Sequence, residues 1–378
     1  MISLQPVGLG LCKVVTQSPA DKPWWLAFSR IPGVGAARIQ LLRSCFGSLK
    51  DAWAAPEREL AAAGLPEAVA REVARVRLAV DPEGELARLA QLQVSAITLL
   101  EPEYPTWLQH IQSPPAVLYV RGSLQPQDEL ALAVVGTRRA TRYGLEVTRR
   151  IVPELVRAGV TIVSGLALGI DGAAHQAALD AGGRTLAVMA CGVDVVYPRE
   201  HRLLARAICE NGALLSEYPL GVQPDARNFP PRNRIISGLS RGVLVVEAGE
   251  KSGALITAQF ALDQGRETFA IPGSVFSYQS RGTNGLIQRG EAKLVLSADD
   301  ILEELALQRS AAQLEMRLAM PVDDLEKQVL SAISAEPLHI DELSRTLGLP
   351  VAALSSVLMT LELKGLVHSS GQFYSAIT

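Results

Sequence analysis

Short apolar runs alternate with amphipathic stretches through the middle of the chain, and this pattern limits the possible folds more than any other feature. Each run has the length of a strand and is largely apolar, which is typical of strands covered on both faces of a parallel sheet. We therefore predict an α/β fold with an extended Rossmann-like, doubly wound sheet over residues 95–305. The expected strands are LALAVVG, VTIVSG, RTLAVMACG, ALLSEYP, GVLVVEA, ETFAIPG and AKLVLS.

The segments between these runs carry apolar residues at helical spacing. A chain of 378 residues is too long for one ordinary core, so we expect further domains on both sides of the sheet. The helices expected within the sheet domain are Gly144–Ala158, Ile170–Ala181, Arg199–Asn211, Pro231–Leu239 and Gly253–Asp263.

Residues 1–90 are expected to form a helical domain of the SAM or helix-hairpin-helix type. The segment RIPGVGAARIQLL, residues 30–42, places a P-G-V-G turn between two helical patterns, and such hairpins offer backbone N–H groups to DNA phosphates. The same pattern fits a hairpin that only packs within a helical domain, so both interpretations stay open. The surrounding stretch contains no acidic residue, and its cations are Lys22, Arg30, Arg38, Arg43 and Lys50.

Residues 323–378 are expected to form a small winged helix, joined to the sheet by a linker over residues 306–322. Three helical patterns are followed by LVHSSGQFYSAI, which predicts a two-stranded wing around Gly371. The third pattern, PVAALSSVLMTLELKG, would be the recognition helix, and its single cation, Lys364, stands at the far end. Because a helix that reads bases needs polar and cationic side chains, a protein-contact or regulatory role is favoured over DNA reading.

Composition excludes several classes of protein. Apolar residues make up 48% of the chain and charged residues 20%, which is typical of a soluble globular protein. No apolar run is long enough to span a membrane, and the N-terminus lacks the basic start of a signal peptide, so we expect a cytoplasmic protein with no membrane partner. The four cysteines lie far apart and the histidines lack ligand spacing, so neither disulfides nor a metal site is expected.

The turns that follow the expected strands are the most informative part of the sequence. Ligands of open α/β sheets bind at the carboxyl ends of the strands, where helix N-termini direct backbone N–H groups at anions. Four of these turns carry cations, and the turns should meet at one edge of the sheet. The pattern favours a ligand with several phosphates, although any single arginine is more often solvated. The cations are Arg138, Arg139, Arg232, Arg234, Lys251 and Arg281.

Motifs of the common phosphate-transfer and hydrolytic enzymes do not occur in their required context. GEKSG has a lysine and a serine but lacks the spaced glycines of a P-loop. The string GLSRG, residues 238–242, matches G-x-S-x-G but stands before an expected strand instead of after one, so it is not a nucleophile elbow. Ser164, Asp171 and His175 form a conceivable nucleophile set, but no spacing rule joins them, and local capping or packing explains them better. We therefore expect a protein that is not an enzyme and holds no cofactor.

Six motifs, in order, resemble those of the DprA/Smf family, the DNA-processing proteins of bacterial natural transformation: VVGTRRATRYG, SGLALGIDGAAH, GVDVVYP, FPPRNRIISGLS, KSGALITA and GTNGLIQRG. The resemblance implies a mediator that binds and protects single-stranded DNA and loads the recombinase RecA during transformation, and in DNA repair as a further setting. It also implies a homodimer formed through the Rossmann-like domain, without established catalytic activity.

Carried over by position, the resemblance identifies a set of DNA-binding residues. Three of the motifs supply contacts to the DNA backbone, and Gly165 and Gly169 shape the floor of the pocket. The residue before Arg232 is Pro231, where some relatives have a cation. The implied contacts are Gly136, Thr137, Arg138, Arg232, Asn233, Arg234, Lys251, Ser252 and Gly253, to which the turn analysis adds Arg139.

Two functions compete for this pattern. Aromatic residues close to the turns, Phe229, Phe276 and Tyr278, would stack bases in a single-stranded DNA mediator, although Phe229 is equally suited to the core. The alternative is a nucleotide-processing enzyme of the lysine-decarboxylase-like phosphoribohydrolase type, whose fold is similar. Those enzymes carry a P-G-G-x-G-T loop, whereas PGSVFSYQSRGTNG separates P-G from G-T here.

Overall fold

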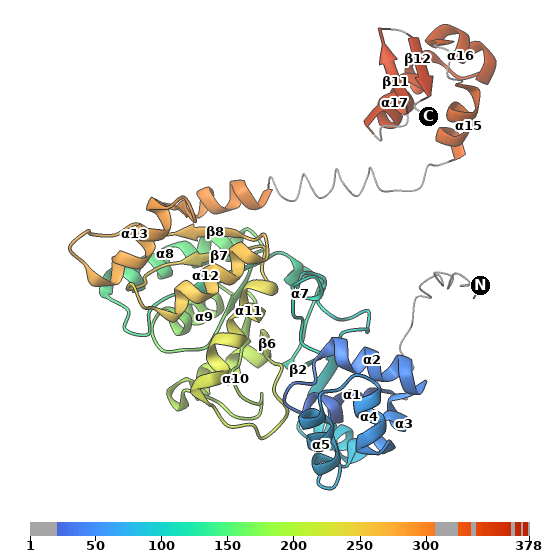
Figure 1. Cartoon of the computed structure of the whole chain (residues 1–378). Helices are drawn as coiled ribbons and strands as arrows, with labels where there is room; N and C mark the ends of the chain where they lie inside the picture. Colours follow the sequence, from blue (N-terminus) through green and yellow to red (C-terminus); the bar gives the residue numbers. More distant parts are fainter. Residues whose placement is uncertain (1–20, 307–323, 334–337, 364–366, 372, 377–378) are drawn as a thin grey trace, which may run out of the picture. The chain divides into compact units, whose positions relative to one another are not determined.

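A computed structural model of the chain describes residues 21–306, 324–333, 338–363, 367–371 and 373–376 (Figure 1). The chain divides into two compact units, Met1–Leu302 and Glu303–Thr378. Each unit is described below by itself. Apart from residue 306, the linker predicted for residues 306–322 lies outside the described residues.

The first unit is built on a nine-stranded sheet in the order β1-β2-β6-β5-β4-β3-β7-β8-β9. All seven predicted strands are present as β3 to β9, and they run parallel to one another. Two strands that the sequence did not predict, β1 and β2, add an antiparallel extension beside β6. The strands are β1 (Val94–Thr98), β2 (Val117–Gly122), β3 (Ala131–Val135), β4 (Thr161–Ser164), β5 (Thr185–Val188), β6 (Gly212–Ser216), β7 (Gly242–Val245), β8 (Glu267–Ala270) and β9 (Lys293–Leu294).

The order of the strands reverses at β3. From β3 the chain adds β4, β5 and β6 on one side, and it then returns to place β7, β8 and β9 on the other side. At such a switch point the connecting segments leave in opposite directions, which opens a crevice at the carboxyl ends of the strands. The fold therefore places the turns after β3 and β7 side by side.

The helices between the strands agree closely with the predicted ones. Gly253–Asp263 has the predicted bounds, and the helix predicted from Arg199 instead begins with a 3-10 turn, Arg199–His201. The helix predicted from Pro231 begins two residues earlier, because prolines at the first helical positions lose no hydrogen bond. These helices are α8 (Arg142–Arg157), α9 (Ile170–Asp180), α10 (Arg202–Glu210), α11 (Phe229–Gly238), α12 (Gly253–Asp263) and α13 (Arg281–Gln288).

The helical region before the sheet belongs to the same compact unit. One continuous core of buried side chains extends from Trp25 in the first helix to Ala261 in α12. The expected hairpin is present, with Gly33 at φ +85° in the turn. The helices here are α1 (Lys22–Ser29), α2 (Ala36–Phe46), α3 (Leu49–Ala54), α4 (Glu57–Ala62), α5 (Glu67–Val76) and α6 (Pro82–Gln91), and α7 (Thr106–Gln109) follows β1.

The second unit is a winged helix with its own small core. Val329, Leu343, Leu354 and Leu358 are buried against one another, and Gly348 ends the second helix in a left-handed conformation. The predicted helices and wing are all present. They are α15 (Asp324–Ala332), β10 (Leu338–His339), α16 (Ile340–Leu347), α17 (Val351–Leu363), β11 (Val367–Ser370) and β12 (Phe373–Ala376), with sheet order β10-β12-β11.

Within the part of the chain that the structure describes, no single helix has the length and apolar composition needed to cross a membrane. The helices α16 and α17 have the required length and apolar composition only when they are taken together, and the two are bent by 110° relative to each other. These two helices contribute Leu343 and Leu354 to the buried core of the small unit.

Candidate nucleic-acid interface

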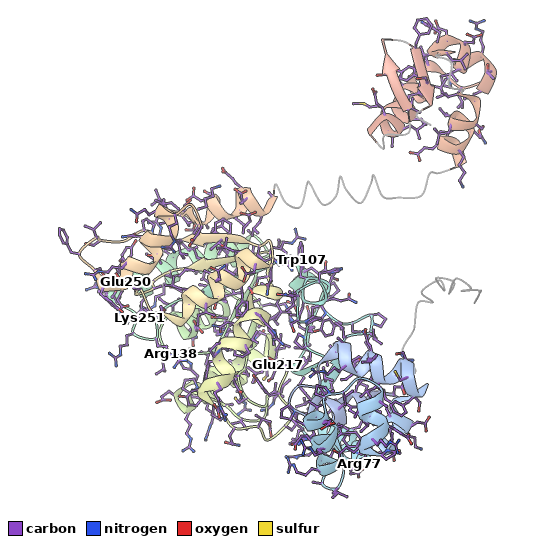
Figure 2. The ribbon with its side chains drawn as sticks, viewed as in Figure 1. Arg77, Trp107, Arg138, Glu217, Glu250 and Lys251 are labelled. Atoms are coloured by element: carbon purple, nitrogen blue, oxygen red, sulfur yellow. The ribbon has the colours of Figure 1, made fainter. Side chains whose placement is uncertain are left out.

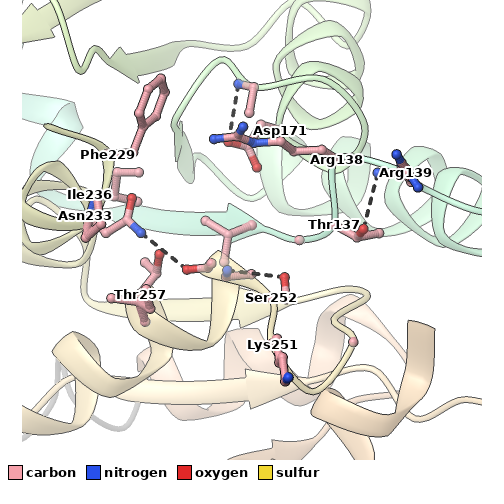
Figure 3. Close-up of a pocket in the computed structure, with 18 of the residues that line it drawn as sticks. Thr137, Arg138, Arg139, Asp171, Phe229, Asn233, Ile236, Lys251, Ser252 and Thr257 are labelled. Atoms are coloured by element: carbon pink, nitrogen blue, oxygen red, sulfur yellow. Dashed lines mark hydrogen bonds between the residues drawn. The ribbon is translucent and has the colours of Figure 1, made fainter. Parts of the chain in front are cut away.

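A pocket of about 490 Å³ opens at the switch point of the sheet. Three segments that are distant in sequence form its walls: the turn after β3, the start of α11 and the segment that leads from β7 into α12 (Figure 3). Its lining includes most of the residues that the sequence predicted to bind a phosphorylated ligand. Those lining residues are Gly136, Thr137, Arg138, Arg139, Phe229, Arg232, Asn233, Lys251, Ser252, Gly253 and Tyr278.

The turn after β3 is held rigidly by the end of β7. Thr137 donates its backbone N–H to the carbonyl of Glu247 at 2.8 Å. The buried carboxylate of Glu247 accepts hydrogen bonds from the backbone N–H and the hydroxyl of Thr141, at 2.9 and 2.5 Å. Because both ends of the turn are tied down, Arg138 and Arg139 are presented to solvent at its tip.

Glycine is required where this turn begins. A Cβ on Gly136 would lie 2.6 Å from Cγ1 of Ile170, the first residue of α9. Gly169, at φ +81°, packs against the backbone of Thr137 and Arg138 in the same way. The glycines thus allow two turns to touch, and this contact sets the position of Arg138.

The opposite wall is the N-terminus of α12. Ser252 caps the helix by accepting a hydrogen bond from the N–H of Ala254 at 3.3 Å, and the exposed Lys251 precedes it (Figure 3). The first N–H groups of a helix have no partner within the helix and attract anions. Among the residues that the structure describes, no atom outside its chain neighbours and its own helix lies within 4 Å of a Cβ built on Gly253, so the side of the backbone that this Cβ would occupy has room for a ligand.

Arg232 lies at the base of the pocket and is almost completely buried, with 4% of its surface exposed. Its guanidinium donates from Nη1 to the carbonyls of Gly165, at 2.8 Å, and Val188. Nε donates to Oδ1 of Asn233 at 3.2 Å. Burial lowers the pKa of Arg232 to about 10, and the neighbouring Asp171 opposes this shift. The side chain therefore joins β4, β5 and α11 beneath the pocket.

Among the described residues that line the pocket, Asp171 is the one acid. Its carboxylate accepts hydrogen bonds from the N–H groups of Gly165 and Ala167, at 3.2 and 3.4 Å. Burial raises the pKa of Asp171, whereas Arg232 and these two N–H groups favour its charged form. Asp171 thus balances the buried Arg232, and the exposed cations at the rim are left for a ligand.

Arg138 is held in place by an aromatic ring. Its guanidinium carbon lies 5.0 Å from the centre of the Phe229 ring, and that of Arg232 lies 5.8 Å from it. The ring of Tyr197 meets Phe229 at a centroid distance of 5.9 Å and an interplanar angle of 62°. These contacts favour a supporting role for Phe229, which keeps the Arg138 side chain over the pocket.

Comparisons with known proteins agree with this architecture. The sequence model of the family described as "DNA recombination-mediator protein A" matches residues 95–306, and that of the "DprA winged helix domain" matches residues 308–371. Protein Smf of Synechocystis sp. is 36% identical over 385 residues, which cover 92% of this chain and 96% of that protein. The chain belongs to the DprA/Smf family.

Other members of the DprA/Smf family are similar in sequence and structure. The DNA processing protein DprA of Bacillus subtilis is 48% identical over 221 residues, which cover 58% of this chain and 74% of that protein. The crystal structure of DprA from Streptococcus pneumoniae superposes with a TM-score of 0.65 and 35% identity, and it covers 77% of this chain and 99% of that chain. A structure of DNA processing protein A from Helicobacter pylori, described for its single-stranded DNA binding mode, superposes with a TM-score of 0.52 and 31% identity. The match covers 58% of this chain and 98% of that chain.

Arg234 does not join the other predicted site residues of this DprA/Smf-family chain. It forms a bidentate ion pair with Glu217, at 2.7 and 3.1 Å, and faces a different cavity beside α2. Figure 2 shows Glu217 nearer to the N-terminal helices than Arg138 and Lys251 are. The structure therefore does not bring Arg234 together with Arg138 in this pocket, because its guanidinium pairs with Glu217.

The predicted aromatic residues separate into three environments. Tyr278 lines the pocket and is 53% exposed. Phe276 is 93% exposed on the loop before it and is not part of the lining, and Phe229 supports Arg138 as described above. Gly165 also lies outside the lining, but a Cβ there would be 2.7 Å from Nη1 of Arg232.

The conceivable nucleophile set is not assembled. Ser164 is buried and donates to the carbonyl of Val134 at 2.7 Å, and Nδ1 of His175 lies 2.6 Å from the hydroxyl of Thr185. Asp171 accepts from backbone N–H groups instead. Each of the three side chains thus has its own structural partner, as the capping and packing explanation predicts.

Sequence reasoning missed Glu247 and Tyr197, and it considered Asp171 as part of a nucleophile set or as a capping residue but not as the partner of Arg232. Glu247, Asp171 and Tyr197 act through contacts with residues far away in the chain, such as Thr141, Arg232 and Phe229. Only Asp171 and Glu247 had a signal, because an acid at a carboxyl end otherwise rich in cations is unexpected. Tyr197 had none beyond its place in a turn after an apolar run.

Proposed function

We propose that the chain binds single-stranded DNA across this pocket and acts as a recombination mediator, without catalysing a reaction. The observation that carries the proposal is the convergence of exposed cations from separate turns, Arg138, Arg139 and Lys251, around one open helix N-terminus. Cations placed around a helix N-terminus in this arrangement match consecutive phosphates of one strand. The family of the chain and the described DNA binding of the Helicobacter pylori relative support this choice of ligand.

The aromatic lining favours a single strand over a duplex. Tyr278 exposes half of its surface at the wall of the pocket, and its ring packs closely over the backbone of Gly249. Bases stack on such rings only when they are unpaired, because in a duplex they are stacked on each other. Phosphate contacts supply affinity for either form, so the preference for single strands should come from the aromatic residues.

The later steps of the proposal concern partners. A mediator would protect incoming DNA and load RecA onto it in natural transformation, and DNA repair is a further setting. Membership of the family supports this proposal.

We also propose that the chain forms a homodimer through its sheet unit in the cytoplasm. Light scattering coupled to gel filtration tests the dimer. The lag before RecA-dependent strand exchange on DNA covered by single-strand-binding protein tests loading, and it should shorten when the mediator is added.

Fluorescence anisotropy tests DNA binding directly. A labelled 20-nucleotide single strand and the matching duplex are titrated with the full chain at several salt concentrations. We expect tighter binding to the single strand and a marked loss of affinity as salt increases. A parallel incubation with AMP, followed by chromatography, tests the phosphoribohydrolase alternative and should release no adenine. Failure to bind the single strand, or release of free base, would reject the proposed function.

A further inference from the structure

A second exposed tyrosine lies one aromatic ring beyond the pocket. Tyr197, in the segment between β5 and α10, packs against Phe229 at 5.9 Å and leaves 43% of its surface exposed. Phe229 itself lines the pocket, whereas Tyr197 does not. Tyr197 is therefore the aromatic residue that a strand would meet next on leaving the pocket on the Phe229 side.

The surface of Phe229 is already engaged by protein groups. The guanidinium groups of Arg138 and Arg232 lie over its ring, and Tyr197 meets it at a steep angle. A base that stacked on Phe229 would have to displace Arg138, one of the proposed phosphate contacts. A base can stack on the exposed ring of Tyr197 without displacing Arg138.

The segment that carries Tyr197 is fixed to the binding edge. Nδ1 of His201 lies 2.9 Å from the carbonyl of Leu166 in the turn after β4. Gly172 leaves room for the same histidine, because a Cβ there would lie 2.5 Å from its ring. Two exposed cations, Arg199 and Arg202, follow Tyr197 closely. An aromatic ring with adjacent cations on a rigid support is the combination that single-strand sites use.

We propose that Tyr197 stacks a base of bound single-stranded DNA, and that the strand crosses the pocket between Tyr278 on one side and Tyr197 on the other. This inference rests on the proposed function. It moves the stacking position on this side of the pocket from Phe229 to Tyr197. It also implies that the site takes nucleotides on both sides of the phosphates bound by Arg138 and Lys251.

Two kinds of oligonucleotide test the proposal. An intact single strand and a strand of the same length made only of abasic sugar-phosphate units are titrated against the full chain. Tyr197→Leu removes the ring, and Tyr197→Phe retains it. Phe373→Leu serves as the matched control, because Phe373 is an aromatic residue of similar exposure, 47%, in the winged helix.

The expected result is a loss that depends on the bases. Tyr197→Leu should bind the intact strand roughly 5- to 30-fold more weakly and the abasic strand within about 2-fold of the wild type. Tyr197→Phe and Phe373→Leu should match the wild type on both strands. A 2-aminopurine base should also be quenched on binding by the wild type and less by Tyr197→Leu.

Other outcomes separate the possible errors. Equal losses on intact and abasic strands would show that Tyr197 only supports Phe229 and Arg138, and would overturn the inference. An unchanged affinity of Tyr197→Leu for the intact strand would also overturn it. In both cases the wild type would still bind, so the proposed function would stand; no binding by the wild type would reject both.

Discussion

The N-terminal helices and the turns around the pocket are both rich in arginine and lysine, but their cations have different partners. In the helical region, three of the cations form ion pairs with acids: Lys22–Glu101 at 2.9 Å, Arg30–Glu85 at 3.1 Å and Arg43–Asp21 at 3.1 Å. At the pocket, Arg138, Arg139 and Lys251 form no ion pair with any residue that the structure describes, and all three are exposed. The first set stabilises the fold, and the second is available to a ligand.

The contrast shows why a run of cations in a sequence does not identify a binding surface. Glu101 is 79 residues from Lys22, so the neutralising acid is invisible in the local sequence. Arg38 of the hairpin donates to the carbonyl of Gly33 in its own turn. This contact ties Arg38 to the turn, and both interpretations of the hairpin stay predictions.

Removing cations from the pocket should have the largest effect. We expect Arg138→Ala combined with Lys251→Ala to weaken binding of a single strand by more than about 100-fold, because charge-assisted contacts contribute roughly 1.5–3 kcal/mol each. Anisotropy at fixed salt measures the loss, and an unchanged urea midpoint serves as control because both side chains are exposed. A change below about 3-fold would place the DNA elsewhere.

Removing cations from the helical region should lower the stability of the protein and leave its DNA affinity unchanged. Arg30→Ala with Arg43→Ala leaves Glu85 and Asp21 without their partners, at sites where the paired side chains are at most 21% exposed. We expect the free energy of unfolding to fall by about 1–2 kcal/mol while DNA affinity stays within about 2-fold. A large loss of affinity with unchanged stability would instead support DNA binding by the hairpin.

His175 is buried in the core of the sheet unit, where its Nδ1 lies 2.6 Å from the hydroxyl of Thr185. Complete burial lowers its pKa to about 3, so the folded protein holds the neutral form while the unfolded chain takes up a proton below pH 6.5. The stability from His175 is therefore present above pH 6.5 and is lost as the pH falls from 6.5 toward 3. Between pH 7 and 5.5 the wild type should lose about 1 kcal/mol more than His175→Gln.

Tryptophan fluorescence during urea unfolding measures this difference. All four tryptophans, Trp24, Trp25, Trp53 and Trp107, belong to the first compact unit, as His175 does. Equal pH dependence of the wild type and His175→Gln would contradict the assignment of a neutral, buried histidine.

Deleting the winged helix should have the smallest effect. Removal of residues 323–378 leaves all the pocket residues in place, since they belong to the other compact unit. We expect affinity for a single strand to stay within about 2-fold in the anisotropy titration. A loss of 10-fold or more would show that the winged helix contacts DNA, although acids outnumber cations in residues 324–378.

The fold of the sheet unit was predictable because its signals are local. The bounds of α12 followed from the helical pattern between Gly253 and Asp263, and in the structure Ser252 caps this helix. The strands β1 and β2 were missed, because β1 is a short alternating segment and the two are separated by a proline-rich stretch. β2 joins the rest of the sheet by pairing with β6, which lies about ninety residues later in the chain.

The candidate site was predictable at the level of turns but not of single side chains. Arg232 and Arg234 are two residues apart on α11, and such positions point to different sides of a helix. One guanidinium is therefore buried beneath the pocket, and the other pairs with Glu217. Tyr197 was missed because its significance depends on contact with Phe229, which only the tertiary structure shows.

The salt dependence of single-strand binding by the wild type and by Arg138→Ala tests the central claim most directly. If the exposed cations at the switch point contact DNA phosphates, log Kd should change linearly with log salt, and the slope for Arg138→Ala should be shallower by about 0.7, the share of one phosphate contact. The account predicts this reduced slope together with weaker binding. Equal slopes for the two proteins would contradict it, because Arg138 would then not displace a counterion from the DNA.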